Sequence, residues 1–445
     1  MQPTIYKLNQ AIRTAKRMIN DNVPGGRKCL AQALEAKYAL EMGHANPPPP
    51  ITPVAVPAEN TILPARFYEL VDELRQGQII WTSATIPTVR NRINREFLEI
   101  LLPLAKTQEN TPLIKFDERQ ESFLTVSLTP TLDLKYCSKT QTATLHAGGK
   151  ALNHMRACQI LGIEHAVVGF GSTARTGQIL SQLCQIGGKL PTNVHLTEID
   201  DDLRIVTILD DEIWKAPGPK ITNKQLKEIA ETFDQQAKNH SWLGLCGALP
   251  VGVSKDFILD ILAKYGKSHK IVMDSADMWE HGIVRPGGPS PFFIKPNMRE
   301  FTDLARKHFW VDALSISENS SPTDPAVIAL ARKFVDELKI PLVVVSKDDE
   351  PFIAASQKET IKVTPPKVEV LGGVGCGDAL VIGMLDVLTR HTIDINGNLE
   401  TGLVAEAARR GSAFAAASAE QAGTGFANDL SRIEQLELAT RIETL

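Results

Sequence analysis

The stretch VLGGVGCGDALVIGML, residues 370–385, decides the fold, because a glycine-rich turn runs directly into an apolar helix there. Glycines in such a turn can adopt positive φ angles and let the backbone approach a ligand closely. The amides at the start of a helix point towards anions, so phosphate is the natural ligand. The stretch lacks the Gly-Lys-Ser/Thr of a P-loop and therefore predicts a different kind of phosphate site.

An aspartate, Asp378, lies inside this turn, although a carboxylate repels phosphate. Its position is explained if it accepts a proton from a hydroxyl that attacks a phosphoryl group. The amides around Gly375, Cys376 and Gly377 would then stabilise the charge of the transition state. The same pattern also fits a helix N-cap without a catalytic role, and the residues alone leave both interpretations open.

From residue 120 onward, short apolar or β-branched runs alternate with helical stretches. This alternation is typical of a parallel sheet that is covered by helices on both faces. The predicted strands are 123–128, 165–171, 242–247, 270–276, 291–296 and 341–346. The predicted helices are 149–161, 176–187, 222–238, 254–265, 298–306, 325–338, 377–389 and 403–420.

Three short runs interrupt this pattern at 194–199, 203–209 and 212–217, and an Asp-rich turn at 200–202 separates the first two. Their alternation of polar and apolar residues is typical of antiparallel strands with one solvated face. They predict a small β lid, at about residues 192–218, that projects from the main sheet.

The first 119 residues have a different character and carry no chemical motif. Residues 1–46 predict helices and contain seven Lys or Arg against three acidic residues, whereas 47–64 is a Pro-rich linker. The segment 65–119 is predicted to pack on the core as a mostly helical extension, with helices at 65–77 and 91–106 and a strand at 79–85.

Composition excludes several classes of protein. With 48 basic and 52 acidic residues the formal net charge is −4, which does not favour nucleic-acid binding. The six cysteines form no Cys-x-x-Cys pair, so neither a disulfide framework nor a thiolate zinc site is indicated. No apolar run approaches the roughly 18 residues of a membrane span. We therefore expect a cytoplasmic protein without a transmembrane segment, with small molecules or proteins as partners.

Residues 370–385 resemble the signature of the PfkB (ribokinase-like) carbohydrate kinases, whose usual Gly-Ala-Gly-Asp is Gly375-Cys376-Gly377-Asp378 here. Four more segments resemble the same family in the same order, at 123–133, 145–153, 245–253 and 293–301. The resemblance covers about residues 121–430. It implies a ribokinase-like three-layer α/β/α fold with a small β lid at 120–445, preceded by a mostly helical N-terminal extension.

Within the family, the segments TPTLD, GGK and IKPN look most like the phosphosugar branch, which includes 1-phosphofructokinase and tagatose-6-phosphate kinase. The substrate-binding residues that this resemblance implies are Asp133, Gly148, Gly149, Lys150, Asn153 and Arg204. The Gly-Gly-Lys turn offers backbone amides and one cation, which suits a doubly charged sugar phosphate. The lid position that is usually Asn in this branch is Val206 here.

The resemblance also implies ATP and Mg²⁺ as cofactors, with Asp378 as the general base and the amides of Gly375, Cys376 and Gly377 as the anion hole. Asn297 and Glu300 would bind magnesium through water, and Ser346 would contact the nucleotide. An Asn-x-x-Glu pair is also a helix-capping pattern, so this alternative stays open. The loop from Ser346 to Pro351 departs from the family pattern, because it has lost both glycines and gained three acids.

The resemblance therefore implies ATP-dependent phosphorylation of a hydroxyl on a sugar phosphate. The substrate that it implies is a ketohexose phosphate such as fructose 1-phosphate, fructose 6-phosphate or tagatose 6-phosphate. It also implies a homodimer through the lid, because the lid commonly pairs between subunits in this family. One alternative is a weakly active or silent family member that binds a sugar phosphate and acts through its N-terminal extension; the altered loop favours it. Another is a kinase for a different sugar or a nucleoside, against which Lys150 and Arg204 argue.

Overall fold

The computed structural model describes residues 66–67, 69–73, 86–101, 121–137, 142–184, 191, 193–209, 212–275, 288, 290–395, 397–421 and 426–445. The chain forms two compact units, Met1–Ile100 and Leu101–Leu445. The predictions for the helices of 1–46, the linker 47–64 and the strand 79–85 lie outside the described residues.

The described part of the first unit is helical, at 66–67 and 69–73 and in helix α4 (Ile86–Leu101). The rings of Phe67 and Phe97 pack edge to face with centroids 5.2 Å apart. Arg66 binds Glu96 of α4 at 2.6 Å and Glu73 of its own segment at 3.0 Å. These residues are therefore helical, with α4 at 86–101 instead of the predicted 91–106, whereas the packing of 65–119 on the core stays a prediction.

The second unit is built on a ten-stranded sheet in the order β14-β13-β12-β11-β10-β9-β8-β1-β4-β5. Its strands are β1 (Phe123–Ser127), β4 (His165–Ser172), β5 (Val194–Ile199), β8 (Trp242–Cys246), β9 (Lys270–Asp274), β10 (Phe293–Ile294), β11 (Leu342–Val345), β12 (Phe352–Ser356), β13 (Thr360–Thr364) and β14 (Arg441–Thr444). The strands from β11 to β4 pair in parallel, as predicted, and β5 adds a further parallel strand that was not predicted for this sheet. The unpredicted strands β12, β13 and β14 extend the sheet in antiparallel fashion.

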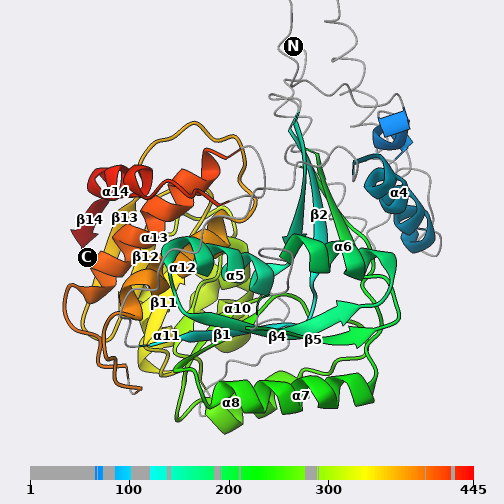
Figure 1. Ribbon diagram of the computed structural model, residues 1–445. Coiled ribbons are helices and arrows are strands. Elements are labelled where there is room, and N and C mark those ends of the chain that lie inside the picture. Colours follow the sequence, from blue (N-terminus) through cyan, green and yellow to red (C-terminus); the bar gives the residue numbers. More distant parts are fainter. Residues whose placement is uncertain are drawn as a thin grey trace, which may run out of the picture. The chain divides into compact units, whose positions relative to one another are not determined.

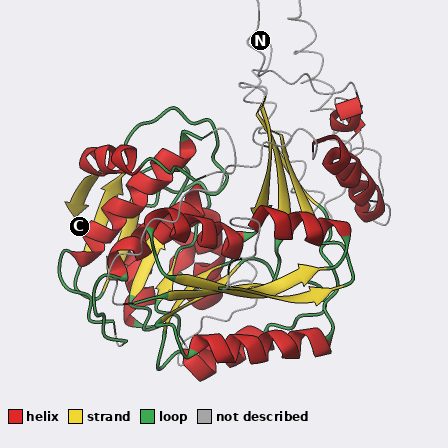
Figure 2. Cartoon of the chain, viewed as in Figure 1, coloured by secondary structure: helices red, strands yellow, loops and turns green. Residues whose placement is uncertain are grey.

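Helices cover both faces of this sheet, which confirms the three-layer α/β/α architecture (Figures 1 and 2). On one face lie α5 (Lys150–Leu161), α12 (Cys376–Leu388) and α13 (Leu403–Ala419), with α14 (Leu430–Ala439) packed on α13. On the other lie α7 (Asn223–Ala237), α8 (Asp256–Tyr265), α10 (Met298–His308) and α11 (Pro325–Asp336). Helix α6 (Arg175–Cys184) contacts both β4 and the smaller sheet.

A second sheet of four strands, in the order β3-β2-β6-β7, forms the lid that projects from the main sheet in Figure 1. Its strands are β2 (Thr131–Cys137), β3 (Thr142–Gly148), β6 (Arg204–Leu209) and β7 (Glu212–Lys215). The predicted lid composition is corrected in two ways. The run 194–199 is β5, which pairs with β4 at the edge of the main sheet, and its middle residues are half-buried on both faces. Residues 131–148 instead supply two lid strands.

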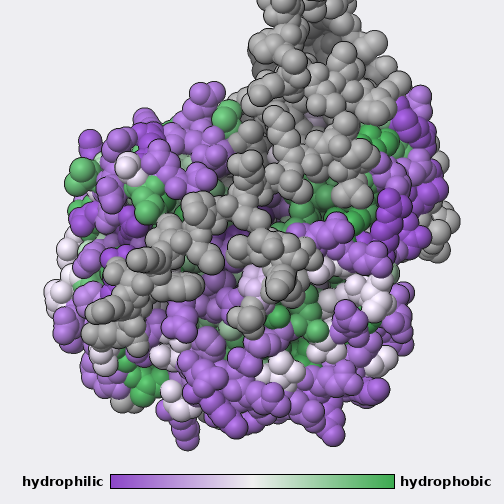
Figure 3. Space-filling view, in the orientation of Figure 1, coloured by the Kyte–Doolittle hydropathy of each residue, from purple (hydrophilic) through white to green (hydrophobic). Residues whose placement is uncertain are grey.

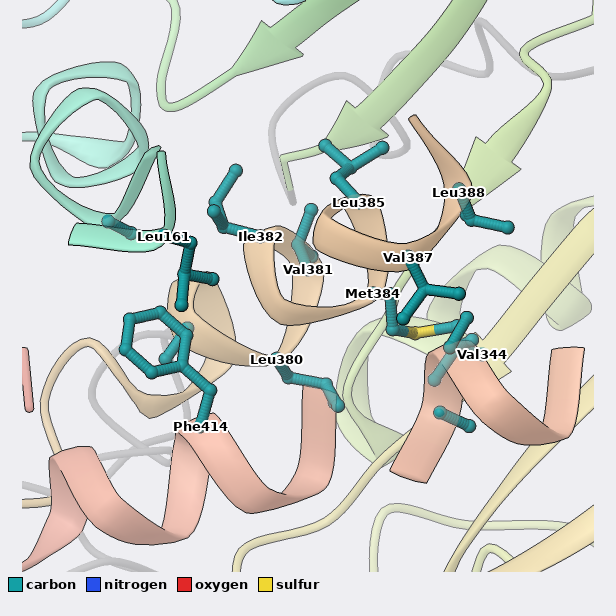
Figure 4. Packing of buried hydrophobic residues seen from close by; sticks show 14 of the residues in the cluster. Leu161, Val344, Leu380, Val381, Ile382, Met384, Leu385, Val387, Leu388 and Phe414 are labelled. Carbon is teal, nitrogen blue, oxygen red and sulfur yellow. The ribbon is translucent and has the colours of Figure 1, made fainter. Parts of the chain in front are cut away.

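The core is centred on α12, which is buried along almost its whole length between α5 and α13. Figure 4 shows Leu380, Ile382 and Met384 of this helix among Leu161 and Phe414 from its neighbours. Such burial explains why the stretch after the glycine turn is apolar on every side rather than on one face. It also fixes the first turn of α12, and with it Asp378, relative to the sheet.

The described surface drawn in Figure 3 is mainly hydrophilic, with small, separate hydrophobic areas. Among the described residues, no helix combines the length and the apolar character that crossing a membrane requires.

Candidate functional site

The candidate site lies where the parallel strands end and the strand order reverses. Strand β1 continues along the chain to β4 on one side, while β8 and β9 lie on its other side. Ser127, Cys246 and Asp274 are aligned at the carboxyl ends of β1, β8 and β9. Open α/β sheets bind ligands at such a reversal point.

Two hydrogen bonds hold the segments after these strands together. The hydroxyl of Thr129 donates to the carbonyl of Ala248, and that of Ser275 donates to the carbonyl of Gly247. Thr129 stands where Asn is usual in the phosphosugar branch, and it connects the segment 123–133 with 245–253. Two of the segments predicted for the site therefore meet in space.

The glycine turn before α12 has the geometry of an anion site. Gly375 is the N-cap, and its φ of 95° lies in the left-handed region that favours glycine. A Cβ on Gly377 would lie 3.2 Å from the Nζ of Lys295, so this ammonium group lies directly against the turn. Burial raises the pKa of the Cys376 thiol to about 11. Cys376 therefore stays a neutral thiol at pH 7, and the positive groups at this turn are the helix-start amides and Lys295.

Asp378, in the first turn of α12, is buried and held by two side chains of α5. The Nζ of Lys150 donates to Oδ1 at 2.8 Å, and the Nδ2 of Asn153 donates to Oδ2 at 2.7 Å. The sequence analysis predicts Asp378 as the base and Lys150 and Asn153 as substrate-binding residues. In the structure the side chains of Lys150 and Asn153 contact Asp378 directly.

Asp274 completes the charged centre of the site from the end of β9. Its Oδ2 accepts a hydrogen bond from Lys150 at 2.8 Å, and its Oδ1 lies 4.0 Å from the Nζ of Lys295. The ligand atoms of His154, Asp274 and Asp378 lie within 4.8 Å of one another, a spacing that also occurs in metal sites. Here the ammonium group of Lys150 lies between the two carboxylates and supplies the positive charge, so we do not identify these residues as metal ligands.

Burial and pairing act in opposite directions on these ionisable groups. Burial would raise the pKa of Asp378, but the charge of Lys150 and the two hydrogen bonds outweigh it, so the pKa lies below its ordinary value. Burial would likewise lower the pKa of Lys150, but Asp274 and Asp378 hold it well above its ordinary value. Asp378 is therefore an ionised carboxylate at neutral pH while Lys150 is bound to it.

The lid contributes Asp133, which lies against the turn that precedes α5. A Cβ on Gly148 would come within 2.2 Å of the Asp133 carboxyl group, so only glycine permits this contact. Gly149, the N-cap of α5, has a φ of 88°, and a Cβ there would lie 2.6 Å from the carbonyl oxygen of Thr129. Asp133 of the lid therefore lies next to the Gly148-Gly149 turn that leads into Lys150 and Asn153 of α5; that these residues bind a substrate stays a prediction.

Burial raises the pKa of Asp133 to about 6, against the hydrogen bond from Thr131 and the charge of Arg156, which lower it. Arg204 starts β6 in register with Thr131, and a Cβ on Gly218 would lie 3.6 Å from its Nε. In the same register Val206 lies beside Asp133, where the branch usually has Asn. One polar side chain of the lid is therefore replaced by an apolar one next to this carboxyl group.

The raised pKa of Asp133 gives a first prediction, for the Asp133→Asn variant. Because the folded-state pKa exceeds the ordinary value of 3.8, Asp133 destabilises the folded protein progressively between about pH 4 and 6, and fully above pH 6. We expect Asn to stabilise the unliganded protein at pH 8 by up to about 3 kcal/mol and to have little effect near pH 4. Urea unfolding at both values measures this. Equal effects at pH 4 and pH 8 would contradict it.

Asn297 and Glu300 form a capping box at the start of α10. The Oδ1 of Asn297 accepts from the amide of Glu300, and the Oε2 of Glu300 accepts from the amide of Asn297, both at 2.9 Å. The alternative of a capping pair is thus observed. The carboxyl group of Glu300 is partly withdrawn from solvent, and this burial raises its pKa.

Ser346 lies beside this cap, since it bridges to Asn297 and its carbonyl oxygen accepts from the amide of Met298 at 2.9 Å. The altered loop after it is a tight hairpin between β11 and β12. Asp348 adopts a left-handed φ of 44° where the family pattern has glycine, and Lys347 binds Glu350 at 2.7 Å. The backbone conformation therefore tolerates the lost glycine, and one of the three acids has a basic partner.

Three further residues that the prediction did not single out lie in the site: His154, Arg156 and Lys295. Arg156 donates to the Oδ1 of Asn153 at 3.4 Å and lies 5.2 Å from the ring centroid of Phe426. His154 lies one helical turn after Lys150 and is fully buried. The signal for both was a polar stripe on the otherwise apolar α5, whereas the position of Lys295 depends on long-range packing.

Comparisons with known proteins identify the family to which this chain is similar. The pfkB family carbohydrate kinases match residues 126–430. The 1-phosphofructokinase of Vibrio cholerae is 26% identical over 278 residues, which are 59% of this chain and 81% of that protein. The 1-phosphofructokinase of Escherichia coli K12 is 26% identical over 301 residues, which are 63% of this chain and 89% of that protein.

Solved structures of sugar kinases have the same fold. Phosphofructokinase-2 from Escherichia coli, in complex with substrates and products, gives a TM-score of 0.57 at 22% identity, and the match covers 71% of this chain and 98% of that one. Ribokinase from Thermotoga maritima gives a TM-score of 0.50 at 16% identity, with 71% and 99% covered.

Proposed function

The chain belongs to the pfkB family of carbohydrate kinases, and we propose that it transfers the terminal phosphoryl group of ATP to a hydroxyl group of a ketohexose phosphate. The observation that carries this proposal is the contact of Asp378 with Lys150 and Asn153 at the glycine-capped start of α12. It combines an anion site, a carboxylate base and a cation within one buried centre, as phosphoryl transfer between anionic substrates requires.

In this mechanism Asp378 accepts the proton of the attacking hydroxyl, which then forms a bond to the phosphoryl group as the bond to ADP breaks. The amides of Gly375, Cys376 and Gly377 and the Nζ of Lys295 stabilise the charge on the transferred group. Asp133 binds a hydroxyl of the sugar from the lid. Lys150 and the amides of Gly148 and Gly149 bind its phosphate, and Arg204 assists from the first residue of β6.

ATP and Mg²⁺ supply the phosphoryl group and neutralise its charge when they are bound. Asn297 and Glu300 offer only oxygen and amide groups, and magnesium prefers oxygen ligands and retains waters. Their capping box holds both side chains at the start of α10, close to Ser346. We propose that they bind the magnesium hydration shell, so that capping and metal binding are two consequences of one arrangement.

The Glu300→Gln variant separates these two roles. Gln keeps an oxygen that accepts from the Asn297 amide, so the cap survives and stability changes by less than about 0.5 kcal/mol. The lost charge should raise the Mg²⁺ concentration for half-maximal rate by about tenfold. Titration of Mg²⁺ in the turnover assay measures this, with Glu300→Ala as the variant that also loses the cap. An unchanged Mg²⁺ requirement in both variants would assign this pair to capping alone.

The direct test of the function is ADP release from Mg-ATP with fructose 1-phosphate, fructose 6-phosphate, tagatose 6-phosphate, the unphosphorylated sugars and a nucleoside. We expect turnover with at least one ketohexose phosphate, far above that of Asp378→Asn. Turnover only with an unphosphorylated sugar or a nucleoside would change the substrate class. No turnover above that variant would reject the kinase proposal.

The acidic loop Asp348–Glu350 favours a second candidate, a family member that binds a sugar phosphate but turns over slowly. Thermal stabilisation by fructose 1-phosphate without ADP release would support it.

We also propose a homodimer through the lid, where Ile213 of β7 keeps 47% of its surface exposed. Light scattering of wild type and Ile213→Lys tests this: a dimer that the substitution weakens is expected, and a wild-type monomer would contradict it.

A further inference from the structure

His154 faces the same two carboxylates as Lys150 but has no role in the mechanism above. The two residues are four positions apart on α5, so their side chains lie on the same face of the helix. The Nε2 of His154 lies 4.0 Å from the Oδ2 of Asp274 and 4.0 Å from the Oδ1 of Asp378. These are the two oxygens that Lys150 contacts at 2.8 Å.

The imidazole of His154 is enclosed by protein, and its Nε2 faces the carboxylates of the site. His154 is fully buried, and its Nε2 has no hydrogen-bond partner among the described residues. Its Nδ1 lies 3.5 Å from the Sγ of Cys246, whose pKa is raised well above its ordinary value by burial and by Asp274. The thiol is therefore neutral and fixes the ring so that Nε2 points to the carboxylates.

The charged groups that face His154 come from four elements. Asp378 of α12 and Asp274 of β9 favour the charged imidazolium, whereas Lys150 of α5 and Lys295, next to β10, oppose it. Burial also opposes it and is the largest influence, so the pKa of His154 lies below its ordinary value. While Lys150 bridges the carboxylates, the imidazole is neutral.

Lys150 bridges Asp274 and Asp378 in the structure, whereas the proposed mechanism needs it to bind the substrate phosphate. It cannot do both from one position. Its side chain keeps 32% of its surface exposed, so it can turn towards the phosphate of a substrate. Two buried carboxylates would then lose their shared cation, and burial together with their mutual repulsion would raise the pKa of Asp378. A protonated Asp378 cannot accept the proton of the attacking hydroxyl.

We propose that His154 is a positioning residue for Asp378: when Lys150 turns to the substrate phosphate, His154 takes up one proton and replaces it as the cation beside both carboxylates. The proton comes from solvent and stays on Nε2, and a small movement closes the 4.0 Å gap to a hydrogen bond. Asp378 thus remains ionised in the substrate complex. This inference rests on the proposed function, since it needs an anionic substrate at Lys150.

The test is the pH dependence of kcat in wild type, His154→Gln and His154→Leu, with saturating substrates between pH 5.5 and 9. Because a cation within 4–6 Å lowers a carboxyl pKa by one unit or more, both variants should lose activity at a pH about one unit higher than wild type. Activity near pH 6 should then fall about tenfold further than at pH 8.5. The amide of Gln is a neutral hydrogen-bond donor. If His154→Gln kept the wild-type pH profile, His154 would act through a hydrogen bond and not through a positive charge, and the inference would be wrong.

A buried histidine far from the site serves as the matched control. His165, at the start of β4, binds the carbonyl of Ile163 at 3.0 Å and is equally enclosed. His165→Gln should change stability without moving the pH profile. If its profile moves as much as that of His154→Gln, or if neither profile moves, the inference is wrong.

A second measurement does not need turnover. NMR of ¹⁵N-labelled histidine, assigned by the signal that His154→Leu removes, should show a neutral imidazole in the free protein and a charged one with fructose 1-phosphate at pH 7. An imidazole that stays neutral in the bound protein overturns the inference even if the kinase is active. Absence of turnover rejects the proposed function, and the NMR result then decides on His154 separately.

Discussion

Asp378→Asn should lower kcat by about 10²–10⁴-fold, the range that a general base contributes. The reason is that asparagine has nearly the same shape but cannot accept the proton of the attacking hydroxyl. Lys150 keeps its bond to Asp274 at 2.8 Å, so the charged centre is not left without a partner. We therefore expect a folded protein with little activity that is somewhat less stable than wild type at neutral pH, because the stabilising charge of Asp378 is lost.

The control for this variant lies on the same helix. Asp386 is almost fully buried, two turns after Asp378, and binds Arg410 at 2.7 Å and Arg390 at 3.0 Å. Asp386→Asn should destabilise the fold, because the buried Arg410 loses a charged partner, and should leave kcat of the folded enzyme unchanged. If Asp378→Asn retained more than a tenth of wild-type kcat, Asp378 would not be the base.

The parallel strands themselves could be predicted because buried strands are continuous apolar runs, as in LVVV of β11, whereas their order in the sheet was not predicted. The lid was only half predictable. β2 reads TLDLKYC and alternates polar with apolar residues, yet its polar side chains Asp133 and Lys135 are buried. β5 alternates too, but it pairs in parallel at the edge of the main sheet. Alternation therefore does not tell to which sheet a strand belongs.

The candidate site shows a similar division. The glycine turns and their neighbours could be recognised in the sequence, because the structure requires glycine there: a side chain at Gly148 would collide with Asp133. The link between Lys150 and Asp274 could not, since 124 positions separate the two in the chain and only the packing of α5 on β1, β4 and β8, next to β9, brings them together. The same holds for His154, whose function depends on what Lys150 does rather than on its own sequence neighbours.

Lys150 is the residue whose loss should have the broadest effect. Lys150→Met removes the cation that joins two buried carboxylates, at 2.8 Å from each. Breaking such a pair is costly, and with a partly exposed lysine we expect about 2–3 kcal/mol of lost stability. We also expect about 100-fold lower kcat/KM for the sugar phosphate, through loss of a charged hydrogen bond to its phosphate. Lys150→Arg, which keeps the charge, should lose less stability.

The pH dependence of this loss identifies its cause. In wild type the pKa of Asp378 is lowered, so it stabilises the folded protein above the unfolded pKa of about 4. Without Lys150, burial raises the pKa of Asp378, and stability then falls as pH rises. The deficit of Lys150→Met in urea unfolding should therefore be small near pH 4 and full at pH 8.

The double variant Lys150→Met/Asp274→Asn distinguishes charge from packing. Removing one carboxylate should restore part of the lost stability at pH 8, because the remaining carboxylate no longer faces a second one. It should not restore kcat/KM, since the cation for the substrate phosphate is still missing. Stability that stays as low as in the single variant would show that the aliphatic stem of Lys150 stabilises the site by packing, and recovered kcat/KM would show that Lys150 does not bind the phosphate.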